Sequence, residues 1–238
     1  MKLHINSSRV YLEEFAKKAA QSIPSGSIVL DAGAGDAPYK QYFAHTIYES
    51  ADFYQVKGAP YDRVTYVCDL SAIPVHGQRY DLIFCSQVLE HVPEPQSVLN
   101  ELFRVLKPMG ELWITAPLFY EEHQIPYDFY RYTRYGLTHI LQKAGFVIKS
   151  IEWLEGYYGA LAYQFRVAGA SLPRHPAAYG GSMLGLLAAI SAIGMRLSSK
   201  LMAIWFERLD LRYKNVKVGF CKNYAVVALK PAKDSQAL

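Results

Sequence analysis

The chain has 238 residues, of which 51% are hydrophobic and 19% are charged, so it is long enough to bury the core of one elaborated domain or of two small ones. Its formal net charge is +4 and its Lys and Arg residues are scattered, which argues against nucleic acid as a partner. Cys68, Cys85 and Cys221 form no CxxC pair, which argues against a disulfide framework. The N-terminal segment has charges where a secretory signal needs an apolar run, so we expect a cytoplasmic protein.

The sequence alternates between helical and strand patterns. Apolar residues recur at helical spacing between Leu12 and Ala19, and a β-branched run, Ile28 to Leu30, follows turn residues. These features predict a helix, a turn and a buried strand. Further strands are expected at residues 46–50, 64–68, 80–85, 111–115, 147–153 and 224–229.

Amphipathic helices are expected between several of these strands. The segment EPQSVLNELFRVLKPMG places five apolar residues on one face: Val98, Leu99, Leu102, Val105 and Leu106. Pro108 with Gly110 is expected to end that helix. A second helix is expected after Thr133, with Gly145 as its stop. Strands that alternate with helices are typical of a parallel sheet covered on both faces. Ligands of such sheets bind beyond the carboxyl ends of the strands.

Two glycines follow the first expected strand in the run IVLDAGAGDAP. Gly33 and Gly35 would let a ligand approach main-chain N–H groups, although simple turn glycines remain an alternative. The third glycine of the dinucleotide fingerprint is missing, which disfavours a nicotinamide-dependent oxidoreductase. Asp31 precedes the loop, where its charge would repel a phosphate and suit a ligand that carries an ammonium group.

The run DAGAGDAPY resembles the first motif of the class I S-adenosylmethionine-dependent methyltransferases, in which an acid precedes GxGxG or GxGxxP. The segments YESAD, VCDL, YDLIFCSQVLEHVPEP and RVLKPMGELWITAPL are similar to later motifs of that family and occur in the same order. The resemblance covers roughly the first 155 residues and recurs near the C-terminus. It implies an α/β fold, a Rossmann-like three-layer sandwich with a seven-stranded mixed sheet in the order 3-2-1-4-5-7-6.

The resemblance also implies S-adenosylmethionine as the cofactor, and no metal. Asp52 is expected to bind the ribose hydroxyls, with Glu49 as a competitor for that role. Asp69 is expected to contact the adenine amino group, with helix capping as the alternative. Arg9 would pair with the methionine carboxylate, unless it is a solvated residue at a helix start. The residues implied for the cofactor are Arg9, Asp31, Ala32, Gly33, Gly35, Asp52, Asp69, Leu70, Ser86 and Gln87.

The segment HQIPYDFYRYT, residues 123–133, is dense in side chains that hydrogen-bond or stack. It resembles an HxxPxDYxRYT segment of a methyltransferase subgroup often associated with bacterial surface-glycan or lipid modification, with Phe129 in place of the first tyrosine. His123, as a base, and Asp128 are the candidate catalytic residues. The alternative is that Asp128 pairs with Arg131 to brace the loop. The candidate acceptor-binding residues are Tyr120, Tyr127, Arg131, Tyr132, Tyr157 and Tyr158.

We expect a core at residues 1–155, a helical insertion at 156–217, and the last strand with a tail at 218–238. The insertion runs apolar from Met183 to Met195, fewer than the roughly 17 residues that cross a bilayer, so no transmembrane span is expected. A helical hairpin or a bent helix is expected at residues 183–206, which would serve as a lid, a homodimer contact or a membrane-surface patch.

The sequence thus predicts a methyltransferase that transfers the methyl group in line to a small-molecule, glycan or lipid-linked acceptor. A non-catalytic protein that binds the cofactor or a partner is the alternative. We expect it in the cytoplasm, either free or peripheral to the inner face of a membrane. The acceptor atom, the use of a general base and the oligomeric state are left open.

Overall fold

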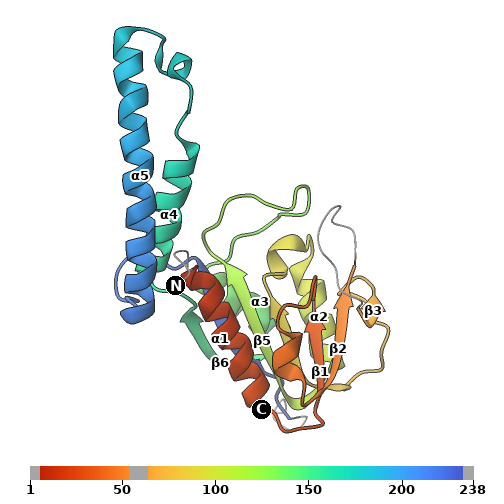
Figure 1. The fold of residues 1–238 in the computed structure, drawn as a ribbon. Helices are drawn as coiled ribbons and strands as arrows, with labels where there is room; N and C mark the ends of the chain where they lie inside the picture. Colours follow the sequence, from red (N-terminus) through yellow and green to blue (C-terminus); the bar gives the residue numbers. More distant parts are fainter. Residues whose placement is uncertain (1–5, 54–63, 233–238) are drawn as a thin grey trace. The chain divides into compact units, whose positions relative to one another are not determined.

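The computed structural model describes residues 6–53 and 64–232 (Figure 1). The helices are α1 (Ser7–Gln21), α2 (Pro95–Val105), α3 (Arg134–Lys143), α4 (Tyr157–Ser171) and α5 (Met183–Arg212), with short 3-10 helices η1 (Lys40–Phe43), η2 (Leu89–His91) and η3 (Pro176–Tyr179). The strands are β1 (Ile28–Ala32), β2 (Ile47–Asp52), β3 (Tyr66–Val67), β4 (Tyr80–Ser86), β5 (Leu106–Pro117), β6 (Val147–Trp153) and β7 (Asn223–Leu229). The chain divides into two compact units. We call them the core unit (Leu12–Leu154 and Asn223–Leu238) and the hairpin unit (Met1–Tyr11 and Glu155–Lys222).

The seven strands form one sheet in the order β3-β2-β1-β4-β5-β7-β6, which confirms the expected topology. Strands β1 to β5 pair in parallel, whereas β7 runs antiparallel to both β5 and β6. Because β1, β2 and β4 are parallel neighbours, the loops that follow them meet at one edge of the sheet. This edge is where a ligand site is expected.

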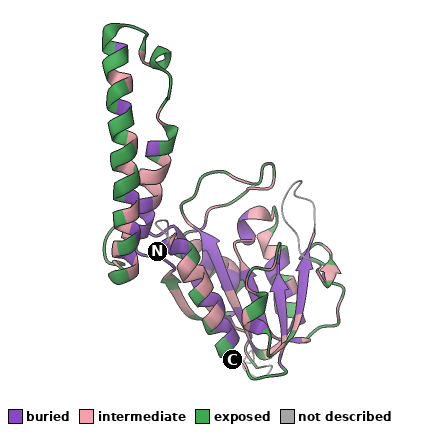
Figure 2. Ribbon diagram, viewed as in Figure 1, coloured by how far each residue is buried: buried purple, intermediate pink, exposed green. Residues whose placement is uncertain are grey.

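The centre of the sheet is buried on both faces, as expected for strands covered by helices (Figure 2). Leu30, Leu82 and Phe84 have no exposed surface. The ring of Phe84 lies 6.1 Å from that of Phe15 on α1 and 5.9 Å from that of Phe43 on η1. Burial of each such side chain stabilises the fold by about 1.5 to 3 kcal/mol, so the core holds the loops at the sheet edge in place.

The expected end of helix α2 at Pro108 and Gly110 is wrong. Helix α2 ends at Val105, and Leu106 already pairs with Tyr80 as the start of β5. Backbone hydrogen bonds join the Pro108 region to Lys230: Met109 N–H donates to the Lys230 carbonyl (2.8 Å), and Lys230 N–H donates to the Gly110 carbonyl (3.0 Å). Pairing with a distant segment therefore decided where the helix stops.

Within the hairpin unit, helices α4 and α5 pack along each other. Phe165 stacks on Phe206 with ring centroids 5.5 Å apart, and Arg166 forms an ion pair with Glu207. Gly169 lets the helices approach closely, since a Cβ there would lie 2.8 Å from the Cβ of Ser199. The expectation of a hairpin within residues 183–206 is wrong, because these residues lie in one helix of 30 residues, α5, whose hairpin partner is α4.

Helix α5 is longer than the apolar run that the length argument against a transmembrane span considered. Among the described residues, α5 is the helix whose length and composition would be sufficient for it to cross a membrane. Its 18-residue window has a mean hydropathy of 1.4 and is 11% buried. The sequence argument stopped counting at Arg196, whereas the helix continues through Arg196 and Lys200 to Arg212.

Candidate functional site

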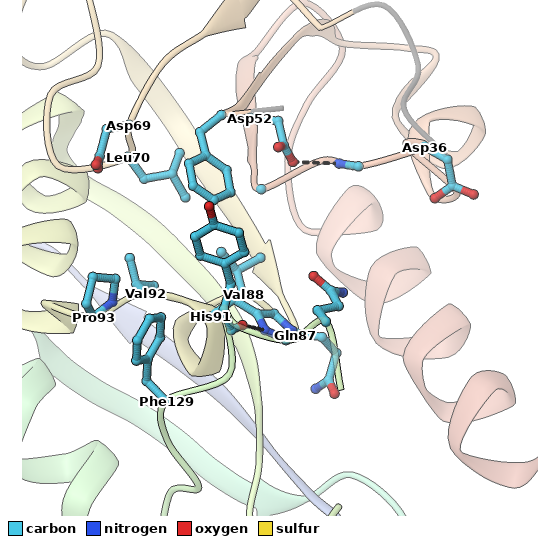
Figure 3. A pocket seen from close by; sticks show the side chains of 15 residues that line it. Asp36, Asp52, Asp69, Leu70, Gln87, Val88, His91, Val92, Pro93 and Phe129 are labelled. Atoms are coloured by element: carbon cyan, nitrogen blue, oxygen red, sulfur yellow. Dashed lines mark hydrogen bonds between the residues drawn. The ribbon is translucent and has the colours of Figure 1, made fainter. Parts of the chain in front are cut away.

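A pocket of about 430 Å³ opens at the carboxyl ends of β1, β2 and β4 in the core unit (Figure 3). A volume of this size is typical of small-molecule and cofactor sites. The described residues that line it are Gly33, Gly35, Asp36, Asp52, Phe53, Asp69, Leu70, Gln87, Val88, His91, Val92, Pro93, Gln124, Tyr127 and Phe129. The pocket thus collects six of the residues implied for the cofactor: Gly33, Gly35, Asp52, Asp69, Leu70 and Gln87.

The two glycines of the loop after β1 are required for different reasons. Gly33 has φ +78°, and a Cβ there would lie 2.4 Å from a methyl carbon of Val88. Gly35 has φ +55°, yet a Cβ there would meet no described atom within 4 Å. Glycine at residue 33 therefore makes room for a protein side chain, whereas the backbone at Gly35 borders open pocket space.

Asp52, at the end of β2, lines the pocket and accepts a hydrogen bond from the Gly35 N–H at 3.0 Å, drawn dashed in Figure 3. Glu49 does not line it. The Glu49 carboxylate pairs with Arg79 and accepts a hydrogen bond from the Tyr80 hydroxyl at 2.8 Å. The hydrogen bonds from Arg79 lower the pKa of Glu49. Of the two competitors for the ribose, Asp52 is thus the acid at the pocket.

Asp69 also lines the pocket, and its Oδ1 accepts a hydrogen bond from the Ser71 N–H at 2.8 Å. No helix directly follows Asp69 in the described part of the chain, so this contact stabilises a turn and is not the helix cap considered as the alternative role. The bond uses one carboxylate oxygen, so it is compatible with a contact to a ligand.

Other residues implied for the cofactor do not line the pocket. Asp31 is 4% exposed and accepts a hydrogen bond from the Tyr48 hydroxyl at 2.5 Å, and burial raises its pKa to about 6. Ala32 is fully buried. Ser86 hydrogen-bonds Thr115 through the two hydroxyls at 2.8 Å. Arg9 is an exposed residue of the hairpin unit.

The catalytic candidates lie in the loop after β5. Both carboxylate oxygens of Asp128 accept hydrogen bonds from Arg131, at 2.7 and 2.8 Å, and one also accepts from the His123 N–H at 2.8 Å. The Arg131 guanidinium holds the pKa of Asp128 well below its usual range. Such a carboxylate is a poor proton acceptor, so the geometry favours bracing of the loop by Asp128.

The acceptor-binding candidates divide between the two units. Tyr127 lines the pocket, and Tyr120 is 38% exposed with its ring 5.0 Å from that of His123. Tyr132 is buried and donates its hydroxyl hydrogen to the Leu89 carbonyl at 2.8 Å. Tyr157 and Tyr158 belong to α4 in the hairpin unit.

Sequence reasoning passed over an acid and a histidine on η2. The Glu90 side chain is fully buried, and neither of its carboxylate oxygens has a hydrogen-bond partner among the described residues. Burial raises the pKa of Glu90 to about 8. His91 lines the pocket, and its Nε2 lies 3.8 Å from the Glu90 Oε1. The sequence signal was the acid–histidine pair in LEHVP directly after β4.

His123 completes a cluster with these two residues. Its ring lies 4.7 Å from that of His91, and the ligand atoms of Glu90, His91 and His123 lie within 4.8 Å of one another, so the three could hold a metal ion. The His91 Nδ1 lies 2.5 Å from the Tyr127 carbonyl oxygen. A proton on Nδ1 serves that hydrogen bond and leaves Nε2 as the acceptor nitrogen. Chemically, the cluster can take up a proton at the wall of the pocket.

Comparison with known proteins agrees with this geometry. Residues 30–114 match the family model described as "Methyltransferase domain". A ubiquinone biosynthesis O-methyltransferase from Salmonella arizonae is 45% identical over 41 residues, which is 17% of this chain and 17% of that protein. The chain thus aligns with less than a fifth of the length of that relative.

Solved structures share the fold at low identity. The (4+2)-cyclase SpnF has a TM-score of 0.57 and 19% identity, with 94% of this chain and 81% of that chain covered. Phosphoethanolamine N-methyltransferase 2 from Haemonchus contortus, in complex with S-adenosyl-L-methionine, has a TM-score of 0.54 and 19% identity, with 95% and 53% covered.

The strand order and the family match together define the class of this protein. The core unit is a Rossmann-like domain of the class I type, with the pocket at the expected edge of the sheet. Residues 30–114 thus match a methyltransferase domain, and the sheet has the strand order of the Rossmann-like methyltransferase fold.

Proposed function

We propose that this protein is an S-adenosylmethionine-dependent methyltransferase that binds its donor in the pocket of the core unit. The observation that carries the proposal is the meeting of the glycine loop, Asp52 and Asp69 around one cavity. Asp52 would accept hydrogen bonds from the ribose hydroxyls while it holds the Gly35 N–H, and Asp69 would face the adenine amino group. Leu70 and Gln87 would complete the walls.

The reaction needs little covalent chemistry from the protein. The sulfonium methyl is already activated, so in-line alignment of donor and acceptor supplies on the order of 7 to 11 kcal/mol of the barrier reduction. The acceptor would enter beside His91, Tyr127 and Phe129, which form the wall of the pocket.

Where the acceptor is a hydroxyl or a protonated amine, the cluster of Glu90, His91 and His123 would receive its proton. Within the cluster, the His91 Nε2 would accept this proton, because the His91 Nδ1 is hydrogen-bonded to the Tyr127 carbonyl oxygen. Asp128 would act as a positioning residue through its hydrogen bond from the His123 N–H. This assigns the base role to the cluster rather than to His123 alone.

For the acceptor we propose a small molecule, a glycan or a lipid-linked compound, modified in the cytoplasm. The name of the Salmonella relative supports an oxygen acceptor and that of the Haemonchus neighbour supports a nitrogen acceptor. We propose that residues 1–155 and 218–238 carry the donor site and that residues 156–217 serve acceptor access. The cyclase among the neighbours is a reminder that one fold hosts several reactions, so function must be tested at the site.

Calorimetry tests the donor site directly. We expect S-adenosylhomocysteine to bind at micromolar concentration and NAD to give no heat, because the loop lacks the third glycine of the dinucleotide fingerprint. Transfer from methyl-labelled donor to cell extracts or lipid extracts would then separate an enzyme from a non-catalytic cofactor-binding protein. Heat with NAD and none with S-adenosylhomocysteine would refute the proposal.

A further inference from the structure

The hairpin unit has an unusual surface charge. Residues 155–222, all of which the structure describes, contain nine Lys or Arg and three acids. All three acids are buried: Glu155 and Asp210 are 0% exposed and Glu207 is 4% exposed. The exposed charged side chains of this segment are therefore all basic, and they are Arg174, Lys200, Arg208, Arg212, Lys214 and Lys217.

Most of α5 in the same unit is exposed (Figure 2), and many of its exposed side chains are large and apolar. Leu184 is 78% exposed, Leu187 is 55% exposed and Ile193 is 64% exposed. At 100° per residue, the exposed large apolar side chains of α5 cover roughly 200° of the helix, twice the stripe of an ordinary core-facing helix. The opposite arc, at Gly185, Ala192 and Ala203, is the one buried in the unit. Water-exposed apolar surface of this extent marks a docking surface.

The charge pattern identifies the occupant. A second copy of the hairpin offers these bases no balancing charge, because residues 155–222 expose no acid. An anionic lipid surface offers acyl chains to the apolar arc of α5 and phosphates to the exposed bases. Trp205, 55% exposed, and Tyr213, 62% exposed, lie toward the basic end, and such side chains favour the level of the lipid headgroups.

The spacing of the charges indicates that α5 lies in the surface rather than across the bilayer. Its charge-free part, Met183 to Met195, is about 20 Å long at 1.5 Å per residue, short of the hydrocarbon thickness of about 30 Å. Arg174 precedes this part and Lys200 follows it. A span of about 20 residues from Met183 would take Arg196 and Lys200 into the hydrocarbon, whereas a helix in the interfacial plane keeps Lys200 among the headgroups.

We propose that the α4–α5 hairpin docks this protein on an anionic membrane surface, with the apolar arc of α5 among the acyl chains and the exposed bases on lipid phosphates. The docking deepens the proposed function by bringing the donor site to membrane-borne acceptors, and that part rests on the proposed function. Binding to lipid does not depend on methyl transfer.

Sedimentation with vesicles tests the docking. We expect the full chain to bind vesicles of phosphatidylcholine with phosphatidylglycerol at least tenfold more tightly than vesicles of phosphatidylcholine alone, with loss of the difference at high salt. The double variant Leu184→Glu and Leu187→Glu should lose binding to both, because it places charge in the apolar arc. The triple variant Lys200→Glu, Arg208→Glu and Arg212→Glu should weaken binding to anionic vesicles more than tenfold.

A matched control reverses three exposed bases of the core unit, Lys18→Glu, Arg134→Glu and Lys143→Glu, with the same change in net charge. It should bind vesicles like the natural chain, and circular dichroism should show that all variants are folded. Equal binding by the double variant and the natural chain would overturn the proposal. The proposal would also be overturned if the natural chain bound no vesicles and light scattering showed a dimer that the double variant converts to a monomer. Accessibility of α5 to reagents on both sides of a vesicle would indicate a crossing helix and refute the surface arrangement.

Calorimetry with S-adenosylhomocysteine on the same samples separates the two proposals. Donor binding without vesicle binding refutes the docking alone. Vesicle binding without donor binding refutes the proposed function alone.

Discussion

At the scale of single residues, two acids on one strand have different tasks. Asp52 lies at the pocket and Glu49 lies in a network with Arg79 and Tyr80. We expect Asp52→Ala to weaken binding of S-adenosylhomocysteine by about 1 to 3 kcal/mol, because it removes a charged hydrogen-bond acceptor from the ribose. Calorimetry measures this loss.

Glu49→Gln is the matched control for Asp52→Ala. It should lower the melting temperature through the weakened pair with Arg79 and leave donor affinity unchanged. If Glu49→Gln weakens donor binding more than Asp52→Ala does, the assignment of the ribose acid is wrong.

The buried carboxyl group of Glu90 should make the free energy of unfolding depend on pH. Its pKa is about 8 in the folded protein, raised by burial from the usual value near 4.5. Between these values the folded state keeps a proton that the unfolded chain has released. The free energy of unfolding therefore falls as pH rises from 5 to 8, by up to about 1.4 kcal/mol per pH unit. Glu90→Gln should flatten that slope in urea titrations at pH 5, 6, 7 and 8.

Glu94→Gln, at an exposed residue nearby, should keep the slope of the natural chain. Asp31, with its pKa raised to about 6, contributes equally to all three proteins. Identical slopes for Glu90→Gln and the natural chain would mean that Glu90 is ionised in the fold.

At the scale of elements, the close approach of α4 and α5 depends on Gly169. A side chain there meets Ser199, whose Cβ would lie 2.8 Å away. We expect Gly169→Leu to force the helices apart at a cost of about 1 to 3 kcal/mol, seen as faster hydrogen exchange in residues 157–212. Ala168→Leu, at an exposed neighbour on the same helix, should leave exchange unchanged. Equal exchange in both variants would show that the helix pair tolerates the added bulk.

At the scale of the whole molecule, the proposed donor pocket and the proposed docking surface belong to different units. In a truncated variant, residues 170–198 are removed and a short turn joins Gly169 to Ser199. These two residues lie close together in the fold, since a Cβ at Gly169 would lie 2.8 Å from the Ser199 Cβ. We expect this truncation to keep donor affinity within about twofold, to lose vesicle binding and to lose methyl transfer to membrane-borne acceptors.

Light scattering before and after the truncation shows whether the hairpin also sets the oligomeric state. Parallel loss of donor affinity and activity would mean that the hairpin is part of the donor site. That result would overturn the division of labour between residues 156–217 and the rest of the chain.

The alternation of strands and helices predicted an α/β fold with a parallel sheet, because hydrophobic periodicity is a local property. The seven-stranded order was an expectation from the resemblance to the class I methyltransferases. The glycine loop, Asp52 and Asp69 could be placed at one edge because parallel strands bring their carboxyl ends together. These features follow from residues near one another in the sequence, or from the geometry of parallel sheets.

Long-range contacts decided the rest. Whether Asp52 or Glu49 faces the pocket depends on Arg79, which lies 30 residues beyond Glu49 and captures its carboxylate. The end of α2 depends on pairing with Lys230, and the unpartnered state of Glu90 depends on how loops from several strands pack over η2. The exposure of α5 likewise appears only in the fold. An apolar run in the sequence has the same pattern whether its side chains are buried in a core or exposed to solvent. These outcomes depend on which surfaces pack together in three dimensions, and the pattern of residues along the sequence does not specify that packing.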